Sequence, residues 1–393
     1  MEDRTMTVSA DIKYVGVNDH EIDLFEGQYV VPNGMAYNSY VIVDEKIVVM
    51  DTVDKHFTQE WLGNVAKVLG NRKPDYLVVQ HMECDHSGSI MAFLNTYPDV
   101  TIVASAKAFT MLHNFHEEKE IPEDKKLEIK EGDTLNLGKH ELAFVAAPMV
   151  HWPEVMMTYD AYDKVLFAAD GFGKFGALDV EEDWACEARR YYFGIVGKFG
   201  PHIQMLLGKA APLMDKIKFI CPLHGPILTE NLGYYIGLYD TWSKYEPETD
   251  GVFIAYASIH GGTAKAAHKL AEILREKGAP KVSIADLSRD DMAEAVEDAF
   301  RMSKLIVCAS SYDAGLFPPM HEFLHKLIIK NYQNRRVGIL ENGSWAPTAG
   351  KVMRNMLLEM KDLEIVSPMV TIRARMKAED LPAMQELADA ILK

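Results

Sequence analysis

The sequence has few cysteines for a chain of 393 residues. The four lie far apart and form no C-x-x-C pair: Cys84, Cys186, Cys221 and Cys308. A disulfide framework, a zinc ribbon and a rubredoxin-type iron site all need closely spaced cysteines. We therefore expect none of these in the chain, and a reducing cytoplasm fits this cysteine usage best.

Positive charge and long apolar segments are scarce as well. The net charge is −17, which makes nucleic acid a poor candidate as a partner. No apolar run reaches the ~18 residues of a membrane-spanning helix. The opening residues Met1-Glu2-Asp3-Arg4 do not resemble a signal peptide. We therefore expect a cytoplasmic protein that has no membrane segment.

The sequence contains enough apolar residues to form more than one hydrophobic core. The hydrophobic fraction is 48%, and this length usually corresponds to about two or three domains. The pattern weakens around residues 231–251 into a polar stretch, where we place a boundary. Residues 252–392 then alternate regularly between strand and helix patterns, which predicts a doubly wound parallel sheet. The expected domains are residues 1–248 and 249–393.

A dense group of metal-binding residue types follows the apolar strand expected at residues 75–79. His81, Glu83, Asp85 and His86 fall within six residues. Alternate side chains of an extended loop point the same way, so the first three can converge on one cavity. We expect His86 to enter from the first turn of a helix that Ser87 caps. A polar surface loop is the alternative, although such loops rarely place this cluster directly behind a buried strand.

Similar residues follow other apolar strands. His151 follows the strand that ends near residue 147, Asp170 follows residues 164–169, and His224 follows residues 217–221. Alone, each histidine is more often structural, and an aspartate before glycine is usually a turn residue. The repeated placement favours one metal site on the rim of a sheet sandwich.

A second site is expected in the alternating part of the chain, where loops follow strands. The first loop has two glycines and a hydroxyl at each end, as in a phosphate cradle at a helix N-terminus. The others bring aromatic residues to the same edge of the sheet, which suits a planar ring. Separately they resemble ordinary turns, but together they favour FMN. Their residues are Ser258, Ile259, His260, Gly261, Gly262, Thr263, Ser310, Ser311, Tyr312, Asp313, Asn342, Gly343, Ser344 and Trp345.

Over nearly its whole length the chain resembles the flavodiiron proteins, also called A-type flavoproteins. The motif at residues 81–86 has the H-x-E-x-D-H form of that family, whereas related zinc hydrolases carry H-x-H-x-D-H. The resemblance implies an α/β fold, in which a metallo-β-lactamase-like αββα sandwich is followed by a flavodoxin-like doubly wound parallel sheet. It also implies two irons: His81, Glu83 and His151 on one, Asp85, His86 and His224 on the other, and Asp170 between them. In some family members the residue matching His86 does not bind the metal.

The resemblance further implies a function. Flavodiiron proteins reduce O2 to water, NO to N2O, or both, and FMN relays electrons from a separate donor. Rubredoxin is the expected donor, and a reduced deazaflavin is the alternative. A head-to-tail homodimer, or a tetramer of such pairs, brings the FMN of one subunit to the irons of its partner.

The sequence departs from the family pattern at positions near the gas pocket. Phe25-Glu26-Gly27 stands where many members have Phe-His-Gly, and Lys174-Phe175 stands where many have Gln-His. Gly262 replaces a hydroxyl residue of the phosphate loop. The changes at residues 25–27 and 174–175 touch the gas pocket and leave the choice between O2 and NO open. The alternative functions are a zinc hydrolase fused to a flavodoxin-like module, and an electron carrier whose first half serves only for docking.

Overall fold

The computed structural model describes residues 7–115 and 121–393, so Met1 to Arg4 lie outside the described residues. Contacts divide the chain into two compact units. The first comprises Met1–Tyr192 and Pro201–Tyr239, and the second comprises Phe193–Gly200 and Asp240–Lys393. The boundary expected after residue 248 stays a prediction.

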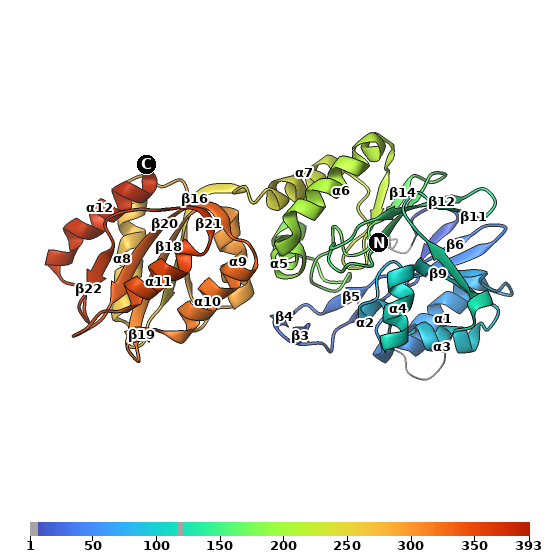
Figure 1. The fold of residues 1–393 in the computed structure, drawn as a ribbon, viewed down its shortest axis with the longest axis horizontal. Helices are drawn as coiled ribbons and strands as arrows, with labels where there is room; N and C mark the ends of the chain where they lie inside the picture. The colour runs from blue at the N-terminus through green and yellow to red at the C-terminus, as the bar shows by residue number, and fades with distance from the viewer. Residues whose placement is uncertain (1–6, 116–120) are drawn as a thin grey trace. The chain divides into compact units, whose positions relative to one another are not determined.

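The first unit is built around two large sheets of the described residues (Figure 1). One has the strand order β1-β6-β7-β8-β9-β10, in which β7 to β10 run parallel and β6 runs antiparallel to both neighbours. The other has the order β11-β12-β13-β14-β15, and only its β14–β15 pair is parallel. The strands are β1 (Ile12–Tyr14), β6 (Tyr40–Val43), β7 (Ile47–Met50), β8 (Tyr76–Val78), β9 (Thr101–Ser105), β10 (Lys126–Ile129), β11 (Thr134–Asn136), β12 (Glu141–Ala146), β13 (Met156–Asp160), β14 (Val165–Phe167) and β15 (Phe219–Cys221).

Apolar side chains from both sheets form one buried cluster. Ile42, Met50 and Val78 come from the first sheet, while Phe144 and Phe167 come from the second. Burying one apolar face of each sheet against the other is what holds such layers together. The helices of this unit are α1 (Thr58–Leu69), α2 (Cys84–Ser87), α3 (Ile90–Thr96), α4 (Ala106–Phe115), α5 (Trp184–Tyr191) and α6 (Gly200–Ala210), with the short turns η1 (Lys55–Phe57), η2 (Glu123–Lys125) and η5 (Ala211–Lys216). Helix α7 (Leu232–Ser243) begins in this unit, and its residues from Asp240 on belong to the second unit. The expected αββα sandwich is confirmed.

The second unit is a parallel sheet with the strand order β17-β16-β18-β20-β21. In chain order this is 2-1-3-4-5, the flavodoxin-like arrangement, which confirms the expected doubly wound sheet. Its elements are β16 (Thr249–Ala257), α8 (Gly262–Glu276), β17 (Val282–Asp286), α9 (Met292–Arg301), β18 (Met302–Tyr312), β19 (Gly315–Leu316), α10 (Pro318–Ile329), β20 (Gln333–Asn342), α11 (Ala349–Leu358), β21 (Lys361–Ile365), β22 (Val370–Ile372) and α12 (Leu381–Leu392). The segment Phe193–Gly200 also belongs here, because the Phe193 ring stacks on Phe300 with centroids 4.0 Å apart.

The structure differs from the sequence expectations in several details. The apolar pattern near residues 365–371 predicts a single strand, whereas the structure has two short strands there, β21 and β22, and both pair with β20. Helix α4 was not expected, although Ser105 Oγ accepts a hydrogen bond from the Ala108 amide at its start. Within the described ranges, no helix combines the length and apolar character needed to cross a membrane. The four cysteines all lie in these ranges and form no disulfide.

One buried histidine ties together strand ends of both sheets. His140 is fully buried, and its Nδ1 lies 3.1 Å from Asp160 Oδ2 at the end of β13. Its Nε2 faces Asp11 Oδ2 at 3.5 Å, just before β1. Burial alone would lower the pKa of His140, but Asp160, Asp11 and Asp163 raise it above its usual value. The other groups around it are Lys139, which pairs with Asp11, the Tyr162 ring, and Asp44, which accepts from the His140 amide.

We expect His140→Asn to destabilise the fold more at low pH than at high pH. A raised pKa means that the folded chain holds this proton more tightly than the unfolded chain does. The stabilisation is therefore complete below the unfolded pKa of about 6.5 and is lost as the pH rises through the folded value. Urea unfolding should show a loss of about 1–3 kcal/mol at about pH 6, and a smaller loss at about pH 9. His113→Asn, at an exposed position, is the control. If His140→Asn lost the same free energy of unfolding at both pH values, His140 would not be charged in the folded protein.

Candidate metal centre

The first group of predicted ligands is held where β8 leads into α2. His81 and Asp85 are buried, and His86 is fully enclosed. Asp85 and His86 lie on the single turn of α2, so their side chains leave the chain in different directions. The expected Ser87 cap is wrong: the Ser87 hydroxyl donates 2.9 Å back to the carbonyl of Met82 and closes the loop.

The other predicted ligands lie where the sequence places them, beyond strand ends of the second sheet. His151 follows β12, Asp170 follows β14, and His224 follows β15. All three are buried. Because β8 of the first sheet ends at the same rim, side chains from distant parts of the chain converge there.

The seven residues form two groups whose potential ligand atoms lie within 4.8 Å of one another. In the first group, Glu83 Oε2 lies 3.3 Å from His81 Nε2 and 3.0 Å from His151 Nε2. In the second, Asp85 Oδ2 lies 3.3 Å from His86 Nε2 and 3.2 Å from His224 Nε2. The members are His81, Glu83, His151 and Asp170 in the first group, and Asp85, His86 and His224 in the second.

Asp170 faces both groups. Its Oδ2 lies 3.4 Å from His81 Nε2 and 3.1 Å from His151 Nε2. Its Oδ1 lies 3.4 Å from His86 Nε2 and 3.9 Å from His224 Nε2. Both oxygens of Asp170 are buried and have no hydrogen-bond partner among the described residues, and the same is true of both oxygens of Asp85. Buried carboxylates without hydrogen bonds are costly unless they bind a cation, so this donor set fits a pair of metal ions.

The site has a strongly negative potential. Burial would lower the pKa of His81, yet Asp170, Glu154 and Glu83 hold it well above its usual value. Burial also disfavours charge on His151, but Asp170 and Glu83 raise its pKa to about 9. Conversely, burial would raise the pKa of Asp170, and the neighbouring histidines keep it well below its usual range. Positive charge is needed here, and metal ions would supply it.

Buried groups outside the predicted set orient the ligands. Glu154 Oε1 accepts from His81 Nδ1 at 2.8 Å and from the Met82 amide at 2.9 Å. The carbonyl of Ala36 accepts from His224 Nδ1 at 2.7 Å. Such partners fix which ring nitrogen faces a metal. The sequence analysis missed Glu154, although it lies only three residues after His151.

Asp51 was missed as well. It is fully buried after β7, and its carboxylate accepts from the Gln80 amide at 2.7 Å and from Gln80 Nε2 at 2.9 Å. Burial raises its pKa to about 6, although the Gln80 and His81 amides oppose that shift. Asp51 follows an apolar strand as the predicted ligands do, so the same signal could have found it.

Aromatic rings surround His224. Phe25, Tyr37 and Tyr191 place their centroids 5.4, 6.1 and 5.5 Å from its ring. The Tyr191 hydroxyl is buried and has no hydrogen-bond partner in the described part of the chain, and burial together with Asp170, Glu83 and Asp85 raises its pKa well above its usual value. This hydroxyl is therefore a free donor close to the carboxylates.

Two of the sequence departures are now placed. Lys174 is buried, pairs with Glu182 and donates to the Phe175 carbonyl at 2.8 Å. Its stem packs where a side chain on Gly225, next to His224, would lie. Glu26, by contrast, is exposed.

The predicted flavin loops lie together in the second unit, at the carboxyl ends of β16, β18 and β20. The chain order reverses between β16 and β18, which is where ligands bind in such sheets. Ser258 Oγ is buried and has no hydrogen-bond partner within residues 7–115 and 121–393. Gly261 has a φ of +80° at the start of α8, and a Cβ on Gly262 would lie 2.2 Å from the Ala374 carbonyl. An open backbone cradle beside a free hydroxyl fits a phosphate.

Some of the remaining loop residues are hydrogen-bonded within the protein, and others are exposed. Thr263 Oγ1 and Ser310 Oγ are 2.7 Å apart, Ser311 Oγ accepts from the Thr348 and Ala349 amides, and Asn342 is paired with the Ala374 backbone. Tyr312 and Trp345 are 45% and 89% exposed, so both rings are free to cover a planar ligand. Their part in FMN binding stays a prediction, as it does for Ile259, His260, Asp313, Gly343 and Ser344.

We expect Glu154→Leu to weaken metal retention by about 10- to 100-fold, because His81 loses the acceptor that orients its ring. Glu154→Gln keeps an oxygen at that position and is the matched control, which should retain metal nearly as the wild type does. Metal analysis after dialysis against graded chelator measures both. Equal retention in the two variants would show that Glu154 does not position His81.

Comparisons with known proteins agree with this geometry. Residues 35–225 match the family model described as "ODP family beta lactamase". The chain is 29% identical to a nitric oxide reductase of Moorella thermoacetica over 98% of both proteins. It is also 29% identical to an anaerobic nitric oxide reductase flavorubredoxin of Escherichia coli O6:K15:H31, over 87% of this chain and 73% of that protein.

Solved structures match both units. The rubredoxin oxygen:oxidoreductase of Desulfovibrio gigas has a TM-score of 0.91 at 26% identity, covering 98% of this chain and 97% of the other. A flavo di-iron protein of Thermotoga maritima, solved as a mutant, has a TM-score of 0.85 at 25% identity over 97% and 95%. With matches across both units, and with a donor set of the H-x-E-x-D-H type, the chain is similar over nearly its whole length to flavodiiron proteins.

Proposed function

We propose that the protein is an oxidoreductase that reduces O2 to water, NO to N2O, or both, at a pair of non-haem irons. The observation that carries this proposal is Asp170, whose two buried oxygens face separate histidine groups. A zinc hydrolase of the same fold typically carries a histidine where this chain has Glu83. Carboxylate-rich ligation instead suits iron that changes oxidation state. The relatives named for nitric oxide and for oxygen support both gases as substrates.

Each of the two groups of predicted ligands would hold one metal ion. His81, Glu83 and His151 would bind one iron, and Asp85, His86 and His224 the other, with Asp170 bridging. Bound there, the pair of irons would bind the diatomic gas and supply it with electrons. The aromatic rings around His224 exclude water from this space. The free Tyr191 hydroxyl can donate a hydrogen bond to an oxygen atom of the substrate.

Electrons would reach the irons through FMN in the second unit. The cradle at Ser258 to Thr263 would hold its phosphate, and Tyr312 and Trp345 would flank its ring. A separate protein such as rubredoxin, or a reduced deazaflavin, would donate the electrons. In this scheme residues 1–248 form the diiron domain and residues 249–393 the FMN domain, in a cytoplasmic enzyme.

We expect the anaerobically reduced protein to be oxidised rapidly by O2, by NO, or by both in stopped-flow experiments. Asp170→Asn should reduce the rate by at least about 100-fold, because an amide offers only one oxygen to the two groups. Asp179→Asn changes an exposed aspartate in the same way and should leave the rate unchanged. Metal analysis should give about two irons per chain. A protein that contains mainly zinc, or that reacts with neither gas, would contradict the proposal.

We also expect the active unit to be a homodimer in which the FMN of one subunit serves the irons of the other. A symmetric dimer can bring different sites of two subunits together. A variant with Ser258 and Thr263 replaced lacks the phosphate cradle, and Asp170→Ala lacks the bridge. Each alone should be inactive, but mixed dimers should regain one working pair. Confirmed subunit exchange without activity would favour transfer within a single chain.

A further inference from the structure

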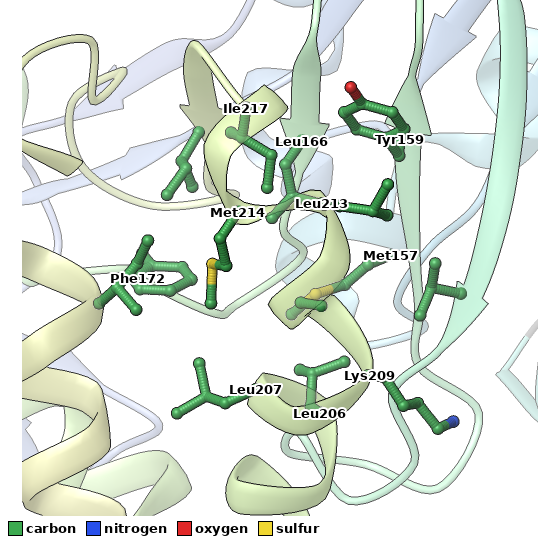
Figure 2. A pocket seen from close by; sticks show the side chains of 14 residues that line it. Met157, Tyr159, Leu166, Phe172, Leu206, Leu207, Lys209, Leu213, Met214 and Ile217 are labelled. Atoms are coloured by element: carbon green, nitrogen blue, oxygen red, sulfur yellow. The ribbon is translucent and has the colours of Figure 1, made fainter. Parts of the chain in front are cut away.

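The first unit contains an apolar cavity that the predicted site does not include. It lies between the second sheet and the helical segment formed by α6 and η5 (Figure 2). Met157 and Leu166 line it from the sheet, Leu206 and Leu213 from the helical side, and Phe172 at one end. Its volume is about 60 Å³, several times the roughly 10–15 Å³ that one water needs.

The chemistry of the lining selects the ligand. The side chains are aliphatic, aromatic or thioether, apart from the Tyr159 hydroxyl and the end of Lys209. The Lys209 amine already pairs with Glu131 at 3.1 Å. A water needs two to four polar partners, whereas apolar space of this kind takes up xenon and similar apolar species. A small uncharged gas suits this space better than water or an ion does.

One end of the cavity adjoins the loop that carries Asp170. Phe172, which forms that end, is two residues beyond Asp170. Met157 Cε lies 2.8 Å from the position that a Cβ on Gly171 would occupy. The Met157 methyl therefore packs directly against Gly171, the residue that follows Asp170. Methionine is flexible and polarizable, so a small motion of this side chain can open the wall.

We propose that this cavity binds the diatomic gas and passes it by Met157 and Gly171 to the centre at Asp170. The inference rests on the proposed function, since it names a route for the same substrates. O2 and NO are small and weakly hydrated, so they concentrate in apolar space. A site filled with such molecules next to the centre raises the frequency of productive encounters.

Xenon under pressure is the probe for the cavity. Crystals of the wild-type protein should show xenon between Leu206 and Leu213, and Ala210→Phe should displace it by filling the lining at Ala210. Ala211→Phe makes the same change one residue further on, at an exposed position, and should leave the xenon site unchanged. If Ala210→Phe does not fold, the smaller Ala210→Val takes its place. A wild-type cavity without xenon would overturn the proposal.

Kinetics then test the route. In Ala210→Phe the second-order rate constant of the reduced enzyme with O2 or NO should fall about tenfold. The turnover at saturating gas, the iron content and the FMN content should be unchanged, and Ala211→Phe should behave as the wild type. Displaced xenon with an unchanged rate constant would overturn the route while leaving gas reduction intact. A wild-type protein that fills with xenon but consumes neither gas would instead remove the proposed function, and the route with it.

Discussion

A buried carboxylate placed between two groups of histidines is the constraint on which the first unit depends. Asp170 can keep its charge at this depth only because His81 and His151 face one oxygen and His86 and His224 face the other. A single metal would leave one oxygen unpaired, so the arrangement favours occupation in pairs. The strand ends that deliver these groups come from both sheets. The sandwich must therefore close fully before either metal position exists.

The convergence of the seven predicted residues could be predicted because it depends on local rules. Each predicted ligand follows an apolar strand, and strand ends that share a rim bring distant residues together. Asp51 also follows an apolar strand, so the same rule could have predicted it. The role of Glu154 depends instead on where a turn folds back toward His81. That is a tertiary contact which spacing along the chain does not encode.

The fold was predictable to a similar degree and for similar reasons. The strong alternation after residue 252 indicated a parallel sheet, and the observed 2-1-3-4-5 order is one of the common orders of doubly wound sheets. The split of one expected strand into β21 and β22 was not predictable, because both short pieces satisfy the same apolar pattern. The Ser87 cap failed for a related reason. Ser87 is the last residue of the α2 turn, and its hydroxyl donates to the Met82 carbonyl, a contact that only the closed loop provides.

The segment Phe193–Gly200 has a consequence for how such a chain can be inherited or rearranged. It lies within the stretch of sequence that otherwise builds the sandwich, yet it packs with Phe300 and Lys330 of the second unit. A recombination event that exchanged everything after residue 248 would separate this segment from its partners and leave the Phe193 ring without its stacking neighbour. A foreign carboxyl-terminal module would have to supply an aromatic residue at the same place. The two halves are thus interlaced in sequence, which favours their evolution as one gene over the free exchange of modules.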